Sequence, residues 1–485
     1  MSTNSFIIDG KTPINGEWVG ADSGVTFPVY NPANGEVLGQ VPDQREAETN
    51  RAIDAAAAAF EEWQWSPVKT RHDILRKWFS LMTEHAEELA RLITLENGKP
   101  LADARGEQTY SASFIEWFAA EAMRAYGDHI PATIDGVRNV TIKQPIGVVG
   151  IITPWNFPSA MITRKVAAAL AAGCTCVIKA PSETPFSALA LAKLAEEAGV
   201  PKGVINVITT GSSSTVGKIL ATHPIIKKIS FTGSTGVGKV LASQCSSTLK
   251  KMSLELGGNA PFIVFDDADI DAAVAGAVIC KFRSSGQTCV CANRLFVQSK
   301  VYDEFAKKLT EAVSKFKVGN GLEQGITHGP LVNAKAAAKV DEHVQDALAK
   351  GAKTLIGGKR GEGAFYEPTV LINIADDAVV MKEETFGPLA PIIKFETEEE
   401  VIKKANDTEF GLAGYFFSRD IGRVWRMAEA LQVGMVGANT GLISQTSCPF
   451  GGVKESGWGK EGSKYGLDDY MVLKYVCMGG INSRR

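Results

Sequence analysis

The chain has 485 residues, which is too long for one compact core and predicts about three domains. Its 51 Lys and Arg against 54 Asp and Glu give a net charge of -3, which excludes a broad attraction to nucleic acid or to an anionic membrane. Eight cysteines and six histidines indicate neither a disulfide scaffold nor a zinc site, and the N-terminus shows no export or transit pattern. We therefore expect a cytoplasmic protein without a metal.

The N-terminal part reads as turns followed by helices. Gly, Pro and Asn separate short apolar pieces over residues 15–45, which indicates hairpins or loops. Ala- and Glu-rich sequence predicts a helix over Ala47–Trp63. Apolar residues at helical spacing predict two more over Ile74–Leu95 and Gln108–Tyr126, and we assign their aromatic residues to the core.

From Ile146 onward, short apolar runs alternate with helical segments. The expected strands are 146–153, 175–179, 204–209 and 228–231, and the expected helices are 163–172, 187–199 and 215–221. This alternation predicts a parallel sheet covered by helices, in which ligands lie beyond the carboxyl ends of the strands.

A second alternation begins near Pro261. Its expected strands are 262–265, 294–298, 353–356, 392–395 and 414–417, with helices over 270–282 and 301–316. Two such units in tandem predict a ligand cleft between them. Thr133–Gln144 predicts a projecting hairpin and Tyr470–Cys477 a further strand, and each is an edge that a second subunit can cover.

Cys289 lies in a segment that indicates an exposed thiol. A Ser-Ser-Gly sequence ending at Gly286 interrupts the helix before it, and glycine permits a turn in which a Cβ would clash. Arg283 and Arg294 flank the cysteine, and positive charge favours the thiolate, which is the reactive form. The competing interpretation is an ordinary buried cysteine.

A glycine-rich turn over Phe231–Lys239 stands between a predicted strand and a predicted helix, where backbone N–H groups can hold phosphate. Gly233–Lys239 has the spacing of a phosphate-binding loop, but Val240 stands where a hydroxyl would bind Mg²⁺. The G-x-G-x-x-G dinucleotide fingerprint does not occur there. A purely structural turn is the alternative.

Two further polar residues stand in settings that suit catalysis. Glu255 lies among leucines and glycines, and apolar surroundings raise the pKa of a carboxyl toward that of a general base. Asn156 lies between Pro154 and Pro158, which fix the backbone around an amide that can donate to an oxyanion. Taken singly, a strand-end glutamate and a turn asparagine explain them equally well.

Together these segments resemble the aldehyde dehydrogenase superfamily over nearly the whole chain. The matching pieces are Pro154-Trp-Asn-Phe-Pro158, Phe231-Thr-Gly-Ser234, Leu254-Glu-Leu-Gly-Gly258, Gly286-Gln-Thr-Cys289, Glu383-Glu-Thr-Phe-Gly-Pro388 and Pro449-Phe-Gly-Gly452. The chain looks most like the succinate-semialdehyde branch, on the segments Met161–Arg164, Lys281–Arg283, Cys289–Cys291, Gly441–Ser444 and Gly462–Gly466. The implied fold is α/β, with two Rossmann-like parallel-sheet domains and a small β oligomerisation element.

The resemblance implies a covalent mechanism. Cys289 would attack the aldehyde, Asn156 and the Cys289 backbone N–H would hold the oxyanion, and Glu255 would activate water to hydrolyse the thioester left after hydride transfer. The residues at cofactor-contact positions are Trp155, Lys179, Ser182, Gly233, Ser234, Glu384 and Phe386. Ser182 replaces the glutamate frequent in NAD-preferring relatives and lies near Lys179, which favours NADP, whereas the adjacent Glu183 would also allow NAD.

The resemblance also implies the substrate. Arg164 and Arg283, with the Ser444 hydroxyl, match positions that hold the substrate carboxylate in the succinate-semialdehyde branch. We expect oxidation of succinate semialdehyde to succinate, a reaction of γ-aminobutyrate degradation. Glutarate semialdehyde or another ω-carboxylated aldehyde is the alternative, because one methylene changes binding by only about 1–3 kcal/mol. The competing classes are a nucleotide hydrolase and a non-catalytic binding protein.

The implied domain bounds are 1–131 and 146–256 for dinucleotide binding, 257–448 for catalysis, and 132–145 with 468–485 for oligomerisation into a dimer or tetramer.

Cys291 is a candidate redox partner of Cys289, because a disulfide between them would block catalysis. The alternative is that Cys291 only packs.

Overall fold

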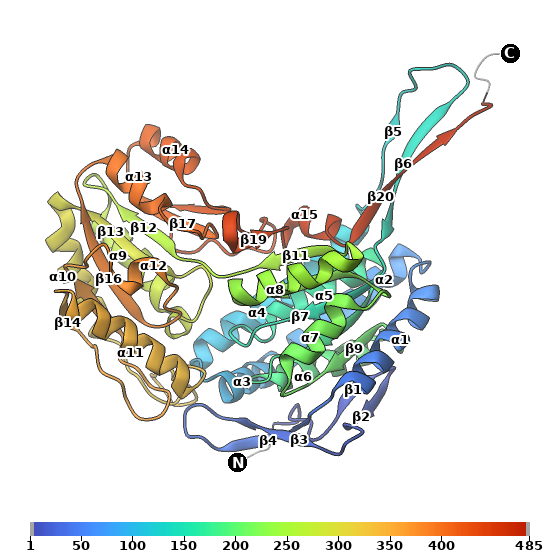
Figure 1. Cartoon of the computed structure of the whole chain (residues 1–485), viewed down its shortest axis with the longest axis horizontal. Coiled ribbons are helices and arrows are strands. Elements are labelled where there is room, and N and C mark those ends of the chain that lie inside the picture. The colour runs from blue at the N-terminus through green and yellow to red at the C-terminus, as the bar shows by residue number, and fades with distance from the viewer. Residues whose placement is uncertain (1–3, 482–485) are drawn as a thin grey trace.

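The computed structural model describes residues 4–481, which form two α/β units and a projecting β arm (Figure 1). Residues 1–3 and 482–485, at the outer ends of the expected domain bounds, lie outside the described residues.

The first unit contains a six-stranded sheet of order β19-β11-β10-β7-β8-β9. The strands are β7 (Val148–Ile152), β8 (Thr175–Lys179), β9 (Ile205–Ile208), β10 (Ile226–Thr232), β11 (Lys251–Glu255) and β19 (Gly457–Trp458). Five of them are parallel, and β19 joins the edge antiparallel to β11. β7 and β8 are buried along their whole length, which explains their continuous apolar sequence.

Helices cover both faces of this sheet. One face carries α1 (Glu46–Trp63), α7 (Ser213–Thr222) and α8 (Thr235–Cys245). The other carries α5 (Ala160–Ala172) and α6 (Pro185–Ala198), backed by α2 (Val68–Glu84), α3 (Ala86–Asn97) and α4 (Leu101–Ala122). The carboxyl ends of β7 and β10 lead into the segments that contain Asn156 and Gly233, so this edge positions the candidate site.

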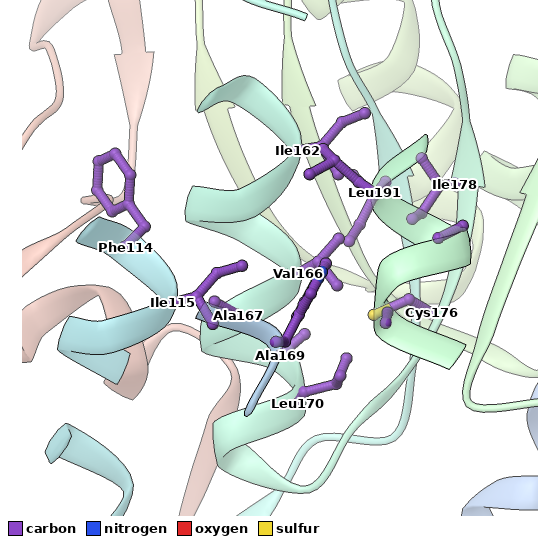
Figure 2. Packing of buried hydrophobic residues seen from close by; sticks show 14 of the residues in the cluster. Phe114, Ile115, Ile162, Val166, Ala167, Ala169, Leu170, Cys176, Ile178 and Leu191 are labelled. Carbon is purple, nitrogen blue, oxygen red and sulfur yellow. The ribbon is translucent and has the colours of Figure 1, made fainter. Parts of the chain in front are cut away.

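Helix α5 is buried at every residue. Figure 2 shows Phe114 and Ile115 of α4 on one side of it, and Cys176, Ile178 and Leu191 on the other. A helix covered all round is normally apolar, yet α5 includes Arg164 and Lys165. Buried cations require a buried partner, and this requirement decides much of the site geometry.

The second unit contains a seven-stranded sheet of order β14-β15-β16-β13-β12-β17-β18, in which only the edge strand β14 is antiparallel. Its strands are β12 (Ala260–Val264), β13 (Ala292–Gln298), β14 (Lys353–Ile356), β15 (Thr369–Ile372), β16 (Leu389–Phe395), β17 (Ala413–Phe417) and β18 (Met435–Ala438). Its helices are α9 (Ile270–Phe282), α10 (Tyr302–Val313), α11 (Ala334–Ala349), α12 (Val379–Lys382), α13 (Glu398–Asn406) and α14 (Ile421–Ala430), whereas α15 (Ser463–Asp468) packs against α4 and α5 of the first unit. Both predicted alternations of strand and helix are confirmed.

A three-stranded antiparallel sheet projects from the body as an arm, shown in Figure 1 near the C-terminus. It consists of β5 (His129–Ile130), β6 (Arg138–Pro145) and β20 (Met471–Met478). β5 pairs with β6 although it precedes the boundary that we placed at residue 132. The turns at the N-terminus form the hairpins β1 (Thr12–Ile14) with β2 (Glu17–Val19), and β3 (Thr26–Tyr30) with β4 (Val37–Pro42).

One predicted helix is wrong. Residues 74–95 form parts of two helices, α2 and α3, which meet at His85 with φ -94° and ψ 16°. The apolar spacing continues across the break because both helices bury side chains in the same core, among them Trp78 and Leu92. Periodicity reports burial and does not detect a change of helix direction.

In residues 4–481, no helix has the length and apolar content needed to cross a membrane. Within the same residues, no group of three or more His, Cys, Asp or Glu has an arrangement suited to a metal ion.

Candidate active site

Cys289 follows a strained bend of the backbone. Ser284, Ser285 and Gly286 have φ of 51°, 53° and 76°, all in the left-handed region. A Cβ on Gly286 would lie 2.2 Å from the carbonyl oxygen of Gly387, so the predicted need for glycine is confirmed. Non-glycine residues in this conformation persist only where surrounding contacts hold them, as is common at functional sites.

The Cys289 side chain is half-buried at a cavity of about 240 Å³. The lining comes from both α/β units and includes Asn156, Gly233, Cys289, Glu384 and Phe386. Burial raises the pKa of the Cys289 thiol to about 12, and the charge of Arg164 opposes this rise. The structure therefore places the candidate nucleophile and the candidate oxyanion donor at one cavity.

Asn156 is buried, and its side-chain Nδ2 donates to the carbonyl of Gln287 at 3.0 Å. Its Oδ1 has no hydrogen-bond partner in the described part of the chain. The amide donor thus points at the segment that leads into Cys289. The carbonyl of Gln287 accepts one N–H of this amide, and the second N–H is left for another oxygen.

A larger cavity of about 680 Å³ adjoins the first, because Pro154, Trp155, Thr232, Gly233 and Ser234 line both. It extends over Lys179, Ser182 and Glu183 to α7 and α8. Trp155 and Phe386 meet edge to face with their ring centroids 5.5 Å apart. All seven residues expected at cofactor-contact positions line one or both cavities.

The polar groups of the larger cavity carry opposing charges. Burial lowers the pKa of Lys179, and the Glu183 carboxylate opposes this shift. The Ser182 hydroxyl donates to Glu183 at 3.1 Å, so a carboxylate stands next to the serine that favours a 2′-phosphate. Burial also raises the pKa of Glu384 to about 7, and its Oε1 accepts a hydrogen bond from the Gly258 N–H at 3.2 Å.

Glu255 ends β11 and is 1% exposed. Burial, followed by the negative charge of Glu461, raises its pKa well above the usual value, while Arg164 and Lys165 lower it. Neither carboxylate oxygen has a hydrogen-bond partner within residues 4–481, and Glu255 is not among the residues that line the Cys289 cavity. It lies close enough for its charge to affect the Cys289 pKa, so we assign it to the cluster beside the cavity.

Arg164 is already paired inside the protein. Its Nε forms an ion pair with Glu461, whose other carboxylate oxygen is paired with Lys165. Burial raises the pKa of Glu461, but the charges of Arg164 and Lys165 outweigh burial and hold this pKa below its usual value. The assignment of Arg164 to the substrate carboxylate therefore stays a prediction, to which the structure adds an ion pair with Glu461.

Arg283 is half-buried, and its guanidinium lies over the Phe157 ring at 5.4 Å from the centroid. No acidic side chain among residues 4–481 forms an ion pair with it. Ser444 is half-buried in the loop after β18, and no hydrogen bond in the described chain joins it to Arg164 or Arg283. Arg283 is thus a cation without an acidic partner among the described residues, and it lies six residues before Cys289 in the chain.

Two other sequence interpretations are wrong. Arg294 does not act on Cys289, because its buried guanidinium donates to the carbonyls of Asn259, Lys404 and Ala405. Lys239 does not cradle phosphate, because it is ion-paired with Glu455 at 2.6 Å.

Cys291 is buried, and Thr288 Oγ1 donates to its Sγ at 2.9 Å. The same sulfur lies 3.3 Å from the carbonyl oxygen of Gly286. Cys289 and Cys291 are both free thiols, and so are the buried Cys174 and Cys176.

Sequence reasoning missed Tyr110, Lys165 and Glu461. Burial raises the pKa of Tyr110 to about 12, while the charges of Arg164 and Arg283 lower it, so its phenol lies within reach of both charges. We had assigned the aromatic residues of this helix to the core. The adjacent cations of α5 were the usable signal for Glu461, because two charges in a buried helix need an acidic partner.

The sequence profile of the aldehyde dehydrogenase family matches residues 18–476 of this chain. The chain belongs to the aldehyde dehydrogenase family. It is 60% identical over 468 residues to the NADP(+) succinate-semialdehyde dehydrogenase of Escherichia coli, covering 96% of this chain and 97% of that one. It is 59% identical over 470 residues to the glutarate-semialdehyde dehydrogenase of Pseudomonas aeruginosa, covering 96% and 97%. The crystal structure of succinate-semialdehyde dehydrogenase from Burkholderia pseudomallei superimposes with a TM-score of 0.97 at 57% identity, covering 99% of both chains.

As an aldehyde dehydrogenase, the chain is an oxidoreductase, and the predicted α/β fold class is confirmed. The nucleotide hydrolase and the non-catalytic binding protein are thereby wrong. The aldehyde dehydrogenase family does not by itself decide between succinate and glutarate semialdehyde, because relatives of both names are equally similar.

Proposed function

We propose that this aldehyde dehydrogenase oxidises ω-carboxylated aldehydes, with succinate semialdehyde as the main substrate, glutarate semialdehyde as the alternative, and NADP as the preferred cofactor. The observation that carries this proposal is the Arg283 guanidinium, which has no acidic partner within residues 4–481 and lies six residues before Cys289. A planar guanidinium without an acidic partner favours an aldehyde with a carboxylate tail.

The larger cavity fits a nicotinamide dinucleotide. Ser234 precedes the first turn of the eleven-residue helix α8, where free backbone N–H groups favour a pyrophosphate. A Cβ on Gly233 would lie 2.4 Å from the Phe231 ring, so the chain leaves this wall without a side chain. Lys179 and Ser182 would hold the ribose end and its 2′-phosphate, and Glu384 the nicotinamide end. The bound cofactor supplies the hydride acceptor.

The reaction follows from the residues around Cys289. The thiolate adds to the aldehyde carbon, and the new oxyanion accepts hydrogen bonds from Asn156 Nδ2 and the Cys289 N–H. One N–H of Asn156 Nδ2 donates to the carbonyl of Gln287, and the second N–H of the same amide is left for the oxyanion. When the hydride departs, the carbon becomes a thioester, and water deprotonated by Glu255 releases the acid and the thiol. The raised pKa of Glu255 suits a group that must accept a proton.

The arm β5-β6-β20 is proposed as the oligomerisation element, and the domain bounds remain as predicted apart from the position of β5. Leu473 and Tyr475 of β20 are 65% and 60% exposed, which favours burial against a second copy. A dimer or tetramer by sedimentation equilibrium supports this assignment, and a monomer contradicts it. The cytoplasmic location and the role in γ-aminobutyrate degradation stay predictions from the sequence.

The substrate proposal is tested by steady-state kinetics with succinate semialdehyde, glutarate semialdehyde and butanal, each with NADP and NAD. Butanal matches succinate semialdehyde in chain length and lacks the carboxylate. We expect kcat/KM for the carboxylated aldehydes to exceed that for butanal by about 10–100-fold, the value of a hydrogen bond to a charged group. Equal values for butanal would exclude an anionic-tail substrate, and a higher value with NAD would reverse the cofactor assignment.

A further inference from the structure

The segment between α3 and α4 reaches the backbone on which Asn156 stands. Lys99 is 1% exposed, and its Nζ donates to the carbonyl of Asn156 at 2.6 Å and to Glu107 at 2.6 Å. The same ammonium lies 4.0 Å from the centroid of the Phe157 ring. A buried cation is therefore fixed to the main chain of the residue whose side chain is the oxyanion donor.

Glu107 and Asn97 hold the same loop on either side. The second carboxylate oxygen of Glu107 accepts hydrogen bonds from the N–H groups of Ser159 at 2.9 Å and Ala160 at 3.3 Å. Asn97 Nδ2 donates to the carbonyl of Trp155 at 3.0 Å. The backbone before and after Asn156 is thus held by one short stretch of chain.

Helix α4 also holds the bend before Cys289. Asp103 Oδ2 accepts a hydrogen bond at 2.8 Å from the N–H of Ser284, which has φ 51°. Asp103 and Glu107 are four residues apart on α4, and this spacing places their side chains on one side of the helix. One side of α4 therefore contacts both the oxyanion-donor loop and the nucleophile loop.

Stability alone does not explain a buried ion pair at this position. Replacing such a pair with apolar residues of similar volume is often neutral or stabilising, because desolvating two charges offsets their attraction. The pair does fix two loops whose relative position matters, since a shift of about 1 Å at a reacting centre reduces rates about 10²-fold.

We propose that Lys99, Glu107 and Asp103 are positioning residues that hold the Asn156 amide and the Cys289 bend at a fixed separation. This inference rests on the proposed oxyanion role of Asn156. Lys99 and Glu107 act through the backbone of residues 156–160, and Asp103 acts through the backbone of Ser284.

The first test compares Lys99→Met with the wild type and with Lys250→Met. Lys250 is a buried lysine that also donates to two carbonyls, those of His223 and Ile226, and does not contact the site. We expect Lys99→Met to lower kcat about 10–100-fold with unchanged aldehyde KM and cofactor Kd, and Lys250→Met to leave all three unchanged. A wild-type kcat for Lys99→Met overturns the proposal.

The second test repeats the substitution in an Asn156→Ala background. If Lys99 acts through Asn156, its removal there reduces kcat by less than about threefold, because coupled residues are not additive. The same fold-loss in both backgrounds overturns the proposal. Asn156→Ala alone with a wild-type kcat would instead refute the oxyanion assignment, so the two failures are distinguishable.

If the Lys99→Met protein does not fold, variants of Glu107 and Asp103 test the same proposal. Glu107→Gln keeps the size of the side chain but only one of the two oxygens that accept hydrogen bonds, and we expect a kcat loss that again vanishes with Asn156→Ala. Asp103→Asn keeps the acceptor for the Ser284 N–H and should retain the wild-type kcat, whereas Asp103→Ala should lose about tenfold. Equal loss in Asp103→Asn and Asp103→Ala would show a general charge effect and overturn the positioning role of Asp103.

Discussion

The Asn156 amide donates to the carbonyl of Gln287, two residues before Cys289, at 3.0 Å. The candidate oxyanion donor is thus held against the nucleophile segment itself. This bond uses one of the two N–H groups of the amide, so the other is left for the oxygen of the substrate, on which negative charge develops in the transition state.

Asn156→Ala should therefore lower kcat about 10²–10³-fold and change the aldehyde KM little, as expected for loss of one oxyanion donor. Steady-state kinetics measure both. Asn406→Ala is the matched control, because Asn406 Nδ2 also donates to a carbonyl, that of Ala430, and is remote from Cys289. A rise in KM with unchanged kcat would show that Asn156 only binds the substrate.

The reactivity of Cys289 should depend strongly on pH. Burial raises its pKa to about 12, so the thiolate fraction of the free enzyme increases about tenfold per pH unit between pH 7 and 9. The iodoacetamide alkylation rate measures this fraction. A rate that reaches a plateau below pH 9 would contradict a raised pKa.

Cys289→Ala should abolish oxidation and retain cofactor binding, and Cys280→Ala, which removes a buried thiol, is its control.

Glu255→Gln should separate the two halves of the reaction. Since the amide cannot deprotonate water, we expect one equivalent of reduced cofactor per site in a rapid burst, followed by a steady-state rate reduced about 10²–10⁴-fold. In the wild type, the raised pKa of Glu255 predicts that thioester hydrolysis becomes faster as pH increases and the carboxylate forms. Loss of the burst in stopped-flow absorbance would place Glu255 in the hydride-transfer half instead.

The two arginines should behave differently. Arg283→Met should lower kcat/KM for succinate semialdehyde about 10–100-fold and leave butanal unaffected, because Arg283 has no acidic partner within residues 4–481. Arg164→Met removes the partner of buried Glu461 and should lower the free energy of unfolding by about 3 kcal/mol, with losses for every aldehyde. Urea unfolding and the two-substrate kinetics measure these effects. A stable Arg164→Met enzyme that discriminates only against charged aldehydes would support Arg164 as a tail-binding residue.

Mild oxidation should test the proposed partnership of Cys289 and Cys291. A disulfide requires Cys291 to leave its hydrogen bond with Thr288, so we expect slow inactivation of the wild type that a thiol reductant fully reverses. Cys291→Ala should not show this reversible loss. Equal and fully reversible loss in both proteins would exclude the pair.

The sequence by itself determined the local elements and the residue types of the site. The strands at 175–179 and 353–356 and the helix at 270–282 have the predicted bounds, because continuous apolar runs and helical spacing reflect local burial. The glycine at 286 was also predictable, since a turn without room for a Cβ needs that residue.

Only the tertiary structure decided how the charges are paired. Arg164 and Arg283 look equivalent in the sequence, yet Arg164 is ion-paired with Glu461 and Arg283 has no such partner in the part of the chain described. Likewise, nothing local to Lys99 indicates that it holds the carbonyl of Asn156. The physical reason is that periodicity reports which side chains are buried, whereas the partner of a buried charge depends on which distant segments share the same volume.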